Sequence, residues 1–339
     1  MKPHILVVGG AGYIGSHMVK RLDEAGYVPV VLDNLSGGHR SGVPAGRLVV
    51  ADMGERGVLD GLFQAFDFSA VMHFASFIQV GESVAEPAKY YDNNLANTLR
   101  LLEAMVRHKV SRFIFSSTAA IFGNPHYVPI DERHPKDPVN PYGRSKLMVE
   151  QILADFDRAY QLRASCLRYF NAAGAEPDAS LGECHEPETH LIPLVLQAAS
   201  GRRAAIVIYG HDYATPDGTC IRDYIHVRDL CDAHLLALEA LIAGGASTHY
   251  NLGNGAGYSI LEVIAAVERV TGHTVAREFG PRRAGDPPSL VADSALVKAE
   301  LCWQPQFADI DTIILHAWRW EQKRFGGARP GEGASAAAR

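Results

Sequence analysis

The sequence has little of what marks secreted, membrane-bound or nucleic-acid-binding proteins. Its five cysteines are scattered without a Cys-x-x-Cys pair, which is typical of a reducing compartment and argues against a disulfide framework or a cysteine zinc site. The net charge is −6, and lysine and arginine form no dense patch. No apolar run approaches the roughly 18 residues of a membrane span, and the N-terminus leads directly into a strand rather than a signal peptide. We expect a cytoplasmic protein with no metal, no nucleic-acid partner and no membrane contact.

Length and composition are those of an ordinary enzyme. With 339 residues the chain can hold one large domain or two modest ones. The pattern changes along the chain and predicts a first domain over 1–172, to which segments of the second half can return, and a second over 173–325. The Gly/Ala-rich tail over 326–339 is expected to be disordered.

A glycine turn near the N-terminus is the first sign of function. Gly9, Gly12 and Gly15 lie between an apolar run over 5–8 and an amphipathic stretch over 13–25. This order is typical of the first βα unit of a dinucleotide-binding fold, in which the amides of a helix N-terminus hold a pyrophosphate. The glycines permit a tight turn, close approach to phosphate, and contact of helix on strand. The alternative is an ordinary βα turn that binds no ligand.

An acidic residue after the next apolar run, 28–32, favours ligand binding. Asp33 lies 18 residues after Gly15, where a carboxylate can accept hydrogen bonds from a ribose diol. No lysine or arginine follows before Arg40, so the sequence predicts NAD rather than NADP. A third strand, over 47–51, ends at Asp52, which we expect at the same sheet edge, close to the adenine amino group.

Strand and helix patterns alternate through the first half. They place helices and strands, in chain order, over 57–66, 70–74, 87–109, 112–115 and 141–160. This alternation predicts an α/β fold with a doubly wound parallel sheet of Rossmann type, followed by a smaller C-terminal α/β substrate domain. Asp92-Asn93-Asn94 are poor helix formers inside the helix at 87–109, and predict either a functional or buried polar site or a solvated helix face.

A tyrosine and a lysine follow a strand end that is rich in hydroxyl groups. Ser116-Ser117-Thr118 closes the strand at 112–115, and Tyr142 and Lys146 lie four residues apart on one face of the next helix. A lysine ammonium beside a phenol favours the phenolate, so we expect the pKa of Tyr142 to fall from about 10 towards the working pH. Tyr142 then becomes a candidate general base or acid. The alternative is a surface Tyr/Lys pair.

The second half carries long polar connections over 174–189 and 210–219, and loops of this length usually serve a site. Arg222, Arg283 and Asp286 are candidate ligands for a diphosphate and a sugar ring, because a guanidinium group matches phosphate with paired donors. Helices are predicted over 229–241 and 259–270, and the second opens with a capping box of Ser259 and Glu262.

The order of these motifs resembles the extended short-chain dehydrogenase/reductase family, and within it the enzymes that epimerise UDP-sugars at C4. Further matching segments are Gly81-Glu82-Ser83, Tyr90-Tyr91-Asp92-Asn93-Asn94, 141–150, Arg168-Tyr169-Phe170-Asn171 and Arg222-Asp223-Tyr224-Ile225-His226-Val227. The similarity runs from Ile5 to about Trp320.

The resemblance implies a role for particular residues. The catalytic residues would be Thr118, Tyr142 and Lys146, with threonine in place of the usual serine. NAD contacts are implied at Gly9, Gly12, Tyr13, Ile14, Gly15, Asp33, Asn34, Asp52, Met53, Phe74, Ala75, Asn93, Lys146 and Phe170. UDP-sugar contacts are implied at Asn171, His190, Leu191, Tyr209, Arg222, Arg283, Asp286 and Leu290. Two positions depart from the family pattern: Ile78 replaces a lysine that often contacts the nicotinamide ribose, and His190 replaces a frequent asparagine.

The implied reaction converts UDP-galactose to UDP-glucose in a homodimer, through a 4-keto sugar, with NAD as the hydride carrier. Another UDP-sugar, such as UDP-N-acetylglucosamine or a UDP-pentose, is an alternative substrate. A nucleotide-sugar dehydratase is disfavoured because Ala119-Ala120 follow Thr118 where that group typically has an Asp-Glu pair. A non-catalytic NAD-binding protein could lack Tyr142 and Lys146, and both are present.

Overall fold

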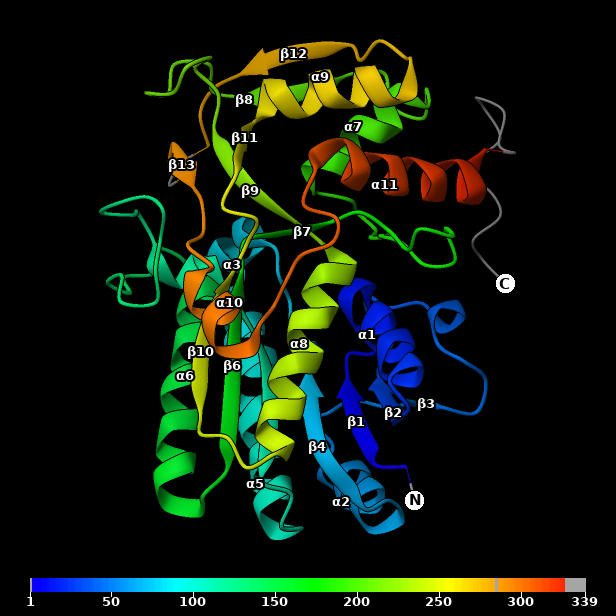
Figure 1. The fold of residues 1–339 in the computed structure, drawn as a ribbon, viewed down its shortest axis with the longest axis vertical. Coiled ribbons are helices and arrows are strands. Elements are labelled where there is room, and N and C mark those ends of the chain that lie inside the picture. Colours follow the sequence, from blue (N-terminus) through cyan, green and yellow to red (C-terminus); the bar gives the residue numbers. More distant parts are fainter. Residues whose placement is uncertain (1, 284–285, 327–339) are drawn as a thin grey trace.

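The computed structural model describes residues 2–283 and 286–326 and is built on a seven-stranded sheet (Figure 1). The strand order is β10-β6-β5-β4-β1-β2-β3, and every neighbouring pair is parallel. The strands are β1 (His4–Val8), β2 (Val28–Asp33), β3 (Leu48–Val50), β4 (Phe68–His73), β5 (Arg112–Thr118), β6 (Arg163–Tyr169) and β10 (Thr248–Leu252). The predicted Rossmann-type parallel sheet is confirmed.

Helices cover both faces of this sheet, which explains why its central strands β1, β2 and β4 are largely apolar. One face is covered by α1 (Tyr13–Glu24) and α8 (Val227–Ile242), and the other by α2 (Arg56–Ala65), α5 (Thr98–Arg107) and α6 (Pro141–Tyr160). Successive side chains of a strand point to opposite faces. Ile5 and Val7 of β1 therefore pack in the core under α1 and α8, and Leu6 and Val8 in the core under α2, α5 and α6.

The chain direction across the sheet reverses beside β1. From β1 it proceeds outward to β2 and β3 on one side, and then crosses to β4, β5 and β6 on the other. In open α/β sheets ligands bind at such a reversal, in the crevice beyond the carboxyl ends of the strands. The fold thus predicts a binding site between the ends of β1 and β4.

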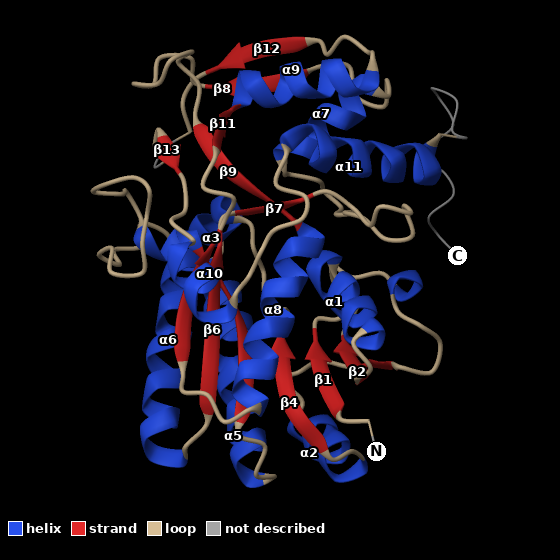
Figure 2. Cartoon of the chain, in the orientation of Figure 1, coloured by secondary structure: helices blue, strands red, loops and turns tan. Residues whose placement is uncertain are grey.

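A smaller unit lies beyond those carboxyl ends (Figure 2). Its helices α7 (Leu191–Ala199), α9 (Ile260–Thr271) and α11 (Ile310–Phe325) share one apolar core. Its strands are β7 (Asn171–Ala173), β8 (Ile206–Tyr209), β9 (Ile221–His226), β11 (Gly257–Ser259), β12 (Arg277–Gly280) and β13 (Ser289–Leu290). Strand β9 pairs with β7, β11 and β13, and β8 pairs with β12. The predicted capping box of Ser259 and Glu262 is present at α9.

Part of the second half returns to the large sheet. Helix α8 and strand β10 complete the large unit, and α10 (Ala295–Leu301) packs against both. We propose that the first domain comprises 2–172 together with this returning segment, and that the rest of 173–325 forms the second. The tail predicted to be disordered lies, apart from Gly326, outside the described residues. Among the described helices none is long and apolar enough to cross a membrane.

The helix predicted over 87–109 is corrected by the structure. It divides into α4 (Pro87–Tyr90), a π-helical segment η2 (Tyr91–Asn97) and α5. Asn94 is only 1% exposed, and its side chain accepts a hydrogen bond from Phe77 N (2.9 Å) and donates one to Phe77 O (3.0 Å). The buried polar alternative is therefore confirmed for Asn94, because the wider π turn aims its amide at the loop after β4. Shorter helical pieces are η1 (Arg40–Gly42), α3 (Val80–Ala85) and η3 (Ala119–Phe122).

A buried ion pair connects α6 to the sheet. Glu150 accepts hydrogen bonds from Arg168 Nε (2.9 Å) and Nη2 (2.6 Å) and from Ser117 Oγ (2.6 Å), and the two charged side chains are 4% and 2% exposed. Although burial alone would raise it, the pKa of Glu150 is lowered by the hydrogen bond from Arg168.

We expect Glu150→Gln to lower the free energy of unfolding by about 3–5 kcal/mol, because it leaves the Arg168 charge buried without its partner. Urea unfolding measures the change. The control is Asp155→Asn on the same helix, whose pair with Arg158 is largely exposed and worth at most about 1 kcal/mol. Equal losses in the two variants would contradict the prediction.

Candidate active site and dinucleotide site

The glycine turn lies at the reversal point and is packed too tightly for side chains. Gly9, directly after β1, has a φ of +80°, and an added Cβ would lie 2.4 Å from Ala75 N, just after β4. An added Cβ on Gly15 in α1 would lie 2.1 Å from Gly9 O. Three backbone segments therefore meet at Gly9, and helix α1 starts directly above the end of β1.

The start of α1 fits a pyrophosphate. Its N-cap is Gly12, which has no side chain to occupy the free amides of the first turn. A Cβ there would meet only Gly9 O, at 3.5 Å, so the space beside the Gly12 backbone is open. Free amides and the positive end of the helix dipole favour an anion at this place.

Asp33 lies at the end of β2, as predicted, and also holds the glycine turn. Its Oδ2 accepts a hydrogen bond from Ala11 N (2.9 Å) and its Oδ1 one from Leu35 N (2.8 Å). A carboxylate has about four acceptor sites, so both oxygens can still accept from a ribose diol. Asn34 Nδ2 donates to Asp52 Oδ2 (2.8 Å), which joins the ends of β2 and β3 at the same edge.

The other residues expected to contact NAD lie along this edge. Phe74 and Ala75 follow β4, Met53 follows β3, Tyr13 and Ile14 begin α1, Asn93 lies in η2 and Phe170 follows β6. Tyr13 OH donates to Gly174 O (2.8 Å), which connects α1 to the long loop of the smaller unit. Ile78, in the lysine position of the family pattern, is 40% exposed.

The predicted catalytic residues come together between β5 and α6. Tyr142 and Lys146 occupy the first turns of α6 and are 9% and 2% exposed, so they are not a surface pair. Lys146 Nζ donates to Ser76 Oγ (2.7 Å) and Ser116 O (2.8 Å). Thr118 ends β5 and forms a hydrogen bond with Tyr142. Asn140 fixes the start of the helix by accepting from Gly143 N (2.8 Å).

The expected lowering of the tyrosine pKa is not found and is corrected here. Burial raises the pKa of Tyr142 above its ordinary value, and the hydrogen bond with Thr118 offsets only part of this. Burial also lowers the pKa of Lys146 to about 7, so its charge is a weak source of stabilisation for a phenolate.

The candidate substrate residues approach the same region from the smaller unit. Arg222 Nη2 lies 2.6 Å from Asp286 Oδ1, and the Arg283 guanidinium stacks 4.1 Å from the centre of the Tyr209 ring. Leu290 pairs with Arg222 between β13 and β9. It also packs, together with Phe170, on the apolar cluster formed by Ala119, Ile121, Phe122 and Ile130. This places Leu290 close to the chain that follows Thr118.

Three further substrate candidates lie in β7 and at the start of α7. Asn171 Nδ2 donates to Asp223 O (2.9 Å), and Leu191 is the first residue of α7. His190, the N-cap of α7, directs its Nδ1 at Glu183 Oε1 (2.8 Å) and Glu188 Oε1 (3.0 Å). This group of acidic and histidine residues was not predicted from the sequence, although the spacing Glu-x-His-x-x-Glu-x-His over 183–190 could have revealed it.

Comparison with known proteins assigns the chain to a family. A family model described as the NAD dependent epimerase/dehydratase family matches residues 5–253. The chain belongs to this family. A relative from Streptococcus mutans named UDP-glucose 4-epimerase is 51% identical over 319 residues, which are 93% of this chain and 96% of the relative.

Solved structures agree with this membership of the NAD dependent epimerase/dehydratase family. UDP-glucose 4-epimerase from Brucella ovis, in complex with NAD, is 50% identical with a TM-score of 0.91, over 94% of this chain and 98% of that one. The UDP-Glc/GlcNAc 4-epimerase from Campylobacter jejuni is 42% identical with a TM-score of 0.83, over 95% of this chain and 99% of that one.

We expect Tyr142→Phe to reduce turnover of UDP-galactose by about 10²–10⁴-fold, because it removes a positioned proton donor and acceptor. Bound NAD(H), measured after denaturation, should be unchanged. The control is Tyr160→Phe at the exposed end of the same helix, which should retain wild-type activity. Activity of Tyr142→Phe within a few fold of wild type would remove Tyr142 from the mechanism.

Proposed function

We propose that this protein interconverts UDP-galactose and UDP-glucose by NAD-dependent epimerisation at C4. The observation that carries the proposal is the buried group of Thr118, Tyr142 and Lys146 at the end of β5, at the sheet edge that holds the glycine turn. Membership of the epimerase/dehydratase family and relatives named UDP-glucose 4-epimerase support it.

The cofactor in this proposal is NAD, held by the residues inferred from the sequence. The uncapped start of α1 would take the pyrophosphate, Asp33 a ribose diol, and Asp52 the adenine amino group. NAD, when bound, supplies a hydride acceptor that returns the hydride later, so the reaction has no net oxidation.

Side chains of the protein transfer the proton of the 4-hydroxyl and stabilise the charge on the 4-oxygen. In the proposal Tyr142 removes the proton of the 4-hydroxyl and later returns it, and Thr118 donates a hydrogen bond to the 4-oxygen as charge develops there. Lys146 would bind the nicotinamide ribose. Arg222 and Arg283 would pair with the diphosphate, whose geometry suits guanidinium donors. The sugar that forms in between carries a ketone at C4, and hydride return to its opposite face inverts that carbon.

Two other functions fit the site less well. A dehydratase needs an acid and a base to eliminate water, and the residues after Thr118 are Ala119 and Ala120, which open the η3 turn and carry no acidic group. A non-catalytic NAD-binding protein gains nothing from burying Tyr142 and Lys146 together beside the cofactor edge.

We also propose a homodimer that resides in the cytoplasm, as the family resemblance implies. All five cysteines are free, in agreement with a reducing compartment. Sedimentation of the purified protein tests the dimer.

Incubation with UDP-galactose and analysis of the product sugar tests the function. The expected product is UDP-glucose with no consumption of added NAD, because the hydride is returned. Release of a dehydrated sugar, or no reaction by protein that carries NAD, would overturn the proposal.

The size of the side chain at position 290 should determine tolerance of an N-acetyl group at C2. Leucine leaves more room than a tyrosine but offers no polar partner, so we expect UDP-N-acetylgalactosamine to be turned over more weakly than UDP-galactose. Leu290→Tyr should lower kcat/KM for the acetylated sugar by a further 10–200-fold or so, equivalent to about 1–3 kcal/mol, and leave UDP-galactose nearly unaffected.

The control for this prediction is Leu290→Met, which nearly conserves volume and should leave both kcat/KM values close to wild type. If Leu290→Tyr and Leu290→Met gave the same acetylated-sugar activity, the Leu290 side chain would not line that part of the pocket.

A further inference from the structure

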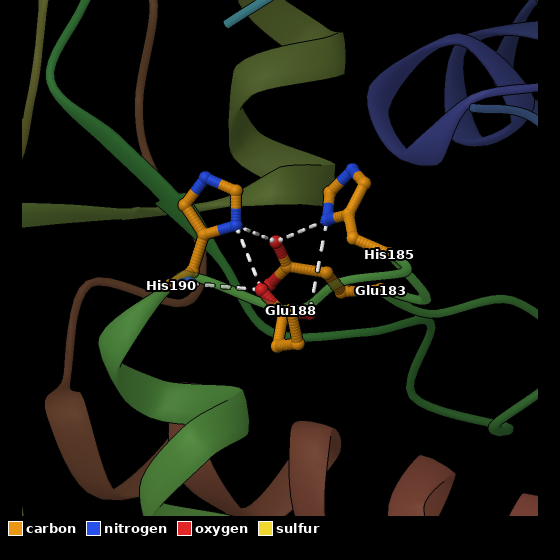
Figure 3. Close-up of side chains that lie close together, drawn as sticks. All are labelled: Glu183, His185, Glu188 and His190. Atoms are coloured by element: carbon orange, nitrogen blue, oxygen red, sulfur yellow. Dashed lines mark hydrogen bonds and ion pairs between the residues drawn. The ribbon is translucent and has the colours of Figure 1, made fainter. Parts of the chain in front are cut away.

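Two glutamates and two histidines converge in the loop before α7 (Figure 3). We refer to Glu183, His185, Glu188 and His190 as the Glu/His cluster. His185 Nδ1 lies 3.1 Å from Glu183 Oε1 and 3.7 Å from Glu188 Oε2, and His190 Nδ1 lies 2.8 Å and 3.0 Å from the same two carboxylates. Each residue contributes one ligand atom, a nitrogen or an oxygen, and these four atoms all lie within 4.8 Å of one another.

The nitrogen–oxygen separations in the Glu/His cluster are close to those between the ligands of a small cation, while the four ligand atoms as a set extend over up to 4.8 Å. Zinc binds imidazole nitrogen and carboxylate oxygen at 2.0–2.2 Å in a tetrahedron, so its ligand atoms lie about 3.3 Å from one another. The nitrogen–oxygen distances in the Glu/His cluster, 2.8–3.7 Å, lie on both sides of this value.

The donor set suits a divalent transition metal. Imidazole is a preferred ligand of zinc, and two carboxylates balance the charge of a divalent ion, whereas calcium and magnesium sites are built from oxygen atoms alone. His185 Nδ1 also lacks a hydrogen bond of good geometry, although it is buried and faces the two carboxylates.

The carboxylates and the loop are held in place by groups behind them. Glu188 Oε1 accepts hydrogen bonds from the backbone N–H groups of Thr189 (2.7 Å) and His190 (2.8 Å). Trp320 Nε1 of α11 donates to Glu183 O (2.9 Å). Such support behind the ligands is a regular feature of metal sites, because it fixes the orientation of each ligand.

We propose that the Glu/His cluster is a structural Zn²⁺ site, with Glu183, His185, Glu188 and His190 as its four ligands. This proposal replaces the UDP-sugar contact inferred for His190 and the expectation of a protein without metal, because His190 Nδ1 is directed at Glu183 and Glu188. With four ligands from the protein, no coordination position is left for a substrate, as in structural rather than catalytic zinc sites. The ion locks the loop that joins β7 to α7, and this loop contacts both units of the fold.

The site is coupled to the dinucleotide edge through Tyr13. The His185 ring lies edge-on to the Tyr13 ring, with 6.3 Å between centroids, and Tyr13 OH donates to Gly174 O at the start of the same loop. On the other side of the loop, an added Cβ on Gly182 would lie 2.3 Å from Trp320 Cγ. Zinc therefore stabilises the segment that lies between α1 and α11.

The competing arrangement is a pair of ion pairs without metal. Burial would lower the pKa values of the two histidines, but Glu183 and Glu188 raise that of His185 to about 9 and that of His190 to about 10. In that state both imidazoles are cations and bind no metal. The two arrangements differ in one measurable quantity, the zinc content.

Untagged protein, freed of metal by dialysis against a chelator, tests the proposal. We expect it to take up one equivalent of Zn²⁺ in competition with a chromophoric chelator, and the melting temperature to rise on addition of Zn²⁺. Co²⁺ in place of zinc should give the intense visible absorption of a tetrahedral site. Wild-type protein that takes up no zinc, or a cobalt spectrum typical of six-coordination, would overturn the proposal.

Variants assign the ligands. Changing a residue that merely supports a metal ligand typically weakens metal binding by roughly 10–100-fold. Glu183→Gln removes a ligand itself, so it should weaken zinc binding by more than this. It should also abolish the zinc-dependent rise in melting temperature. Glu186→Gln makes the same charge change at an exposed position of the same loop and should bind zinc as wild type does. Equal zinc affinity in the two variants would overturn the assignment. If Glu183→Gln fails to fold, the cobalt spectrum of the wild type decides alone.

Discussion

The site depends on how closely three stretches of backbone approach one another at Gly9. The end of β1, the start of the segment after β4 and the first turn of α1 meet there at distances that leave no room for a Cβ. This contact sets the direction of α1 and therefore where its free amides point. It also brings the chain after β4 to the centre of the site, where Ser76 receives a hydrogen bond from Lys146. The proposed dinucleotide site and Lys146 of the proposed catalytic group are thus connected through one packing constraint.

Much of this arrangement could be predicted from the sequence, because local signals agreed with one another. The glycine spacing, Asp33 at a strand end and the four-residue separation of Tyr142 and Lys146 are each short-range features, and the structure places them as expected. The return of β10 to the sheet could not be located from the sequence, because strand partners far apart in the chain leave no local pattern. The only sign in the sequence of the π-helical segment at Asn94 was a run of residues with low helix propensity.

Electrostatics was the least predictable part of the site. A Tyr-x-x-x-Lys pair on one helical face suggested a lowered tyrosine pKa, yet burial acts on both side chains and opposes both charges. The spacing of two residues in the sequence does not predict how deeply their side chains are buried. Their burial depends on every element that packs around them. The Glu/His cluster lies in a loop without helix or strand periodicity, so the Glu-x-His-x-x-Glu-x-His spacing was the signal in the sequence that could have indicated it.

The position of β10 in the sheet has a consequence for biosynthesis. Strand β6 receives its outer neighbour from residues 83 positions later, since Ser165 pairs with Thr248. Until that segment leaves the ribosome, β6 presents an open edge of unpaired amides and carbonyls, the kind of edge to which other chains can add. Contacts between such distant residues also slow folding. A chain interrupted after the first six strands would therefore be prone to aggregation, although it already contains the glycine turn and the Tyr142 helix.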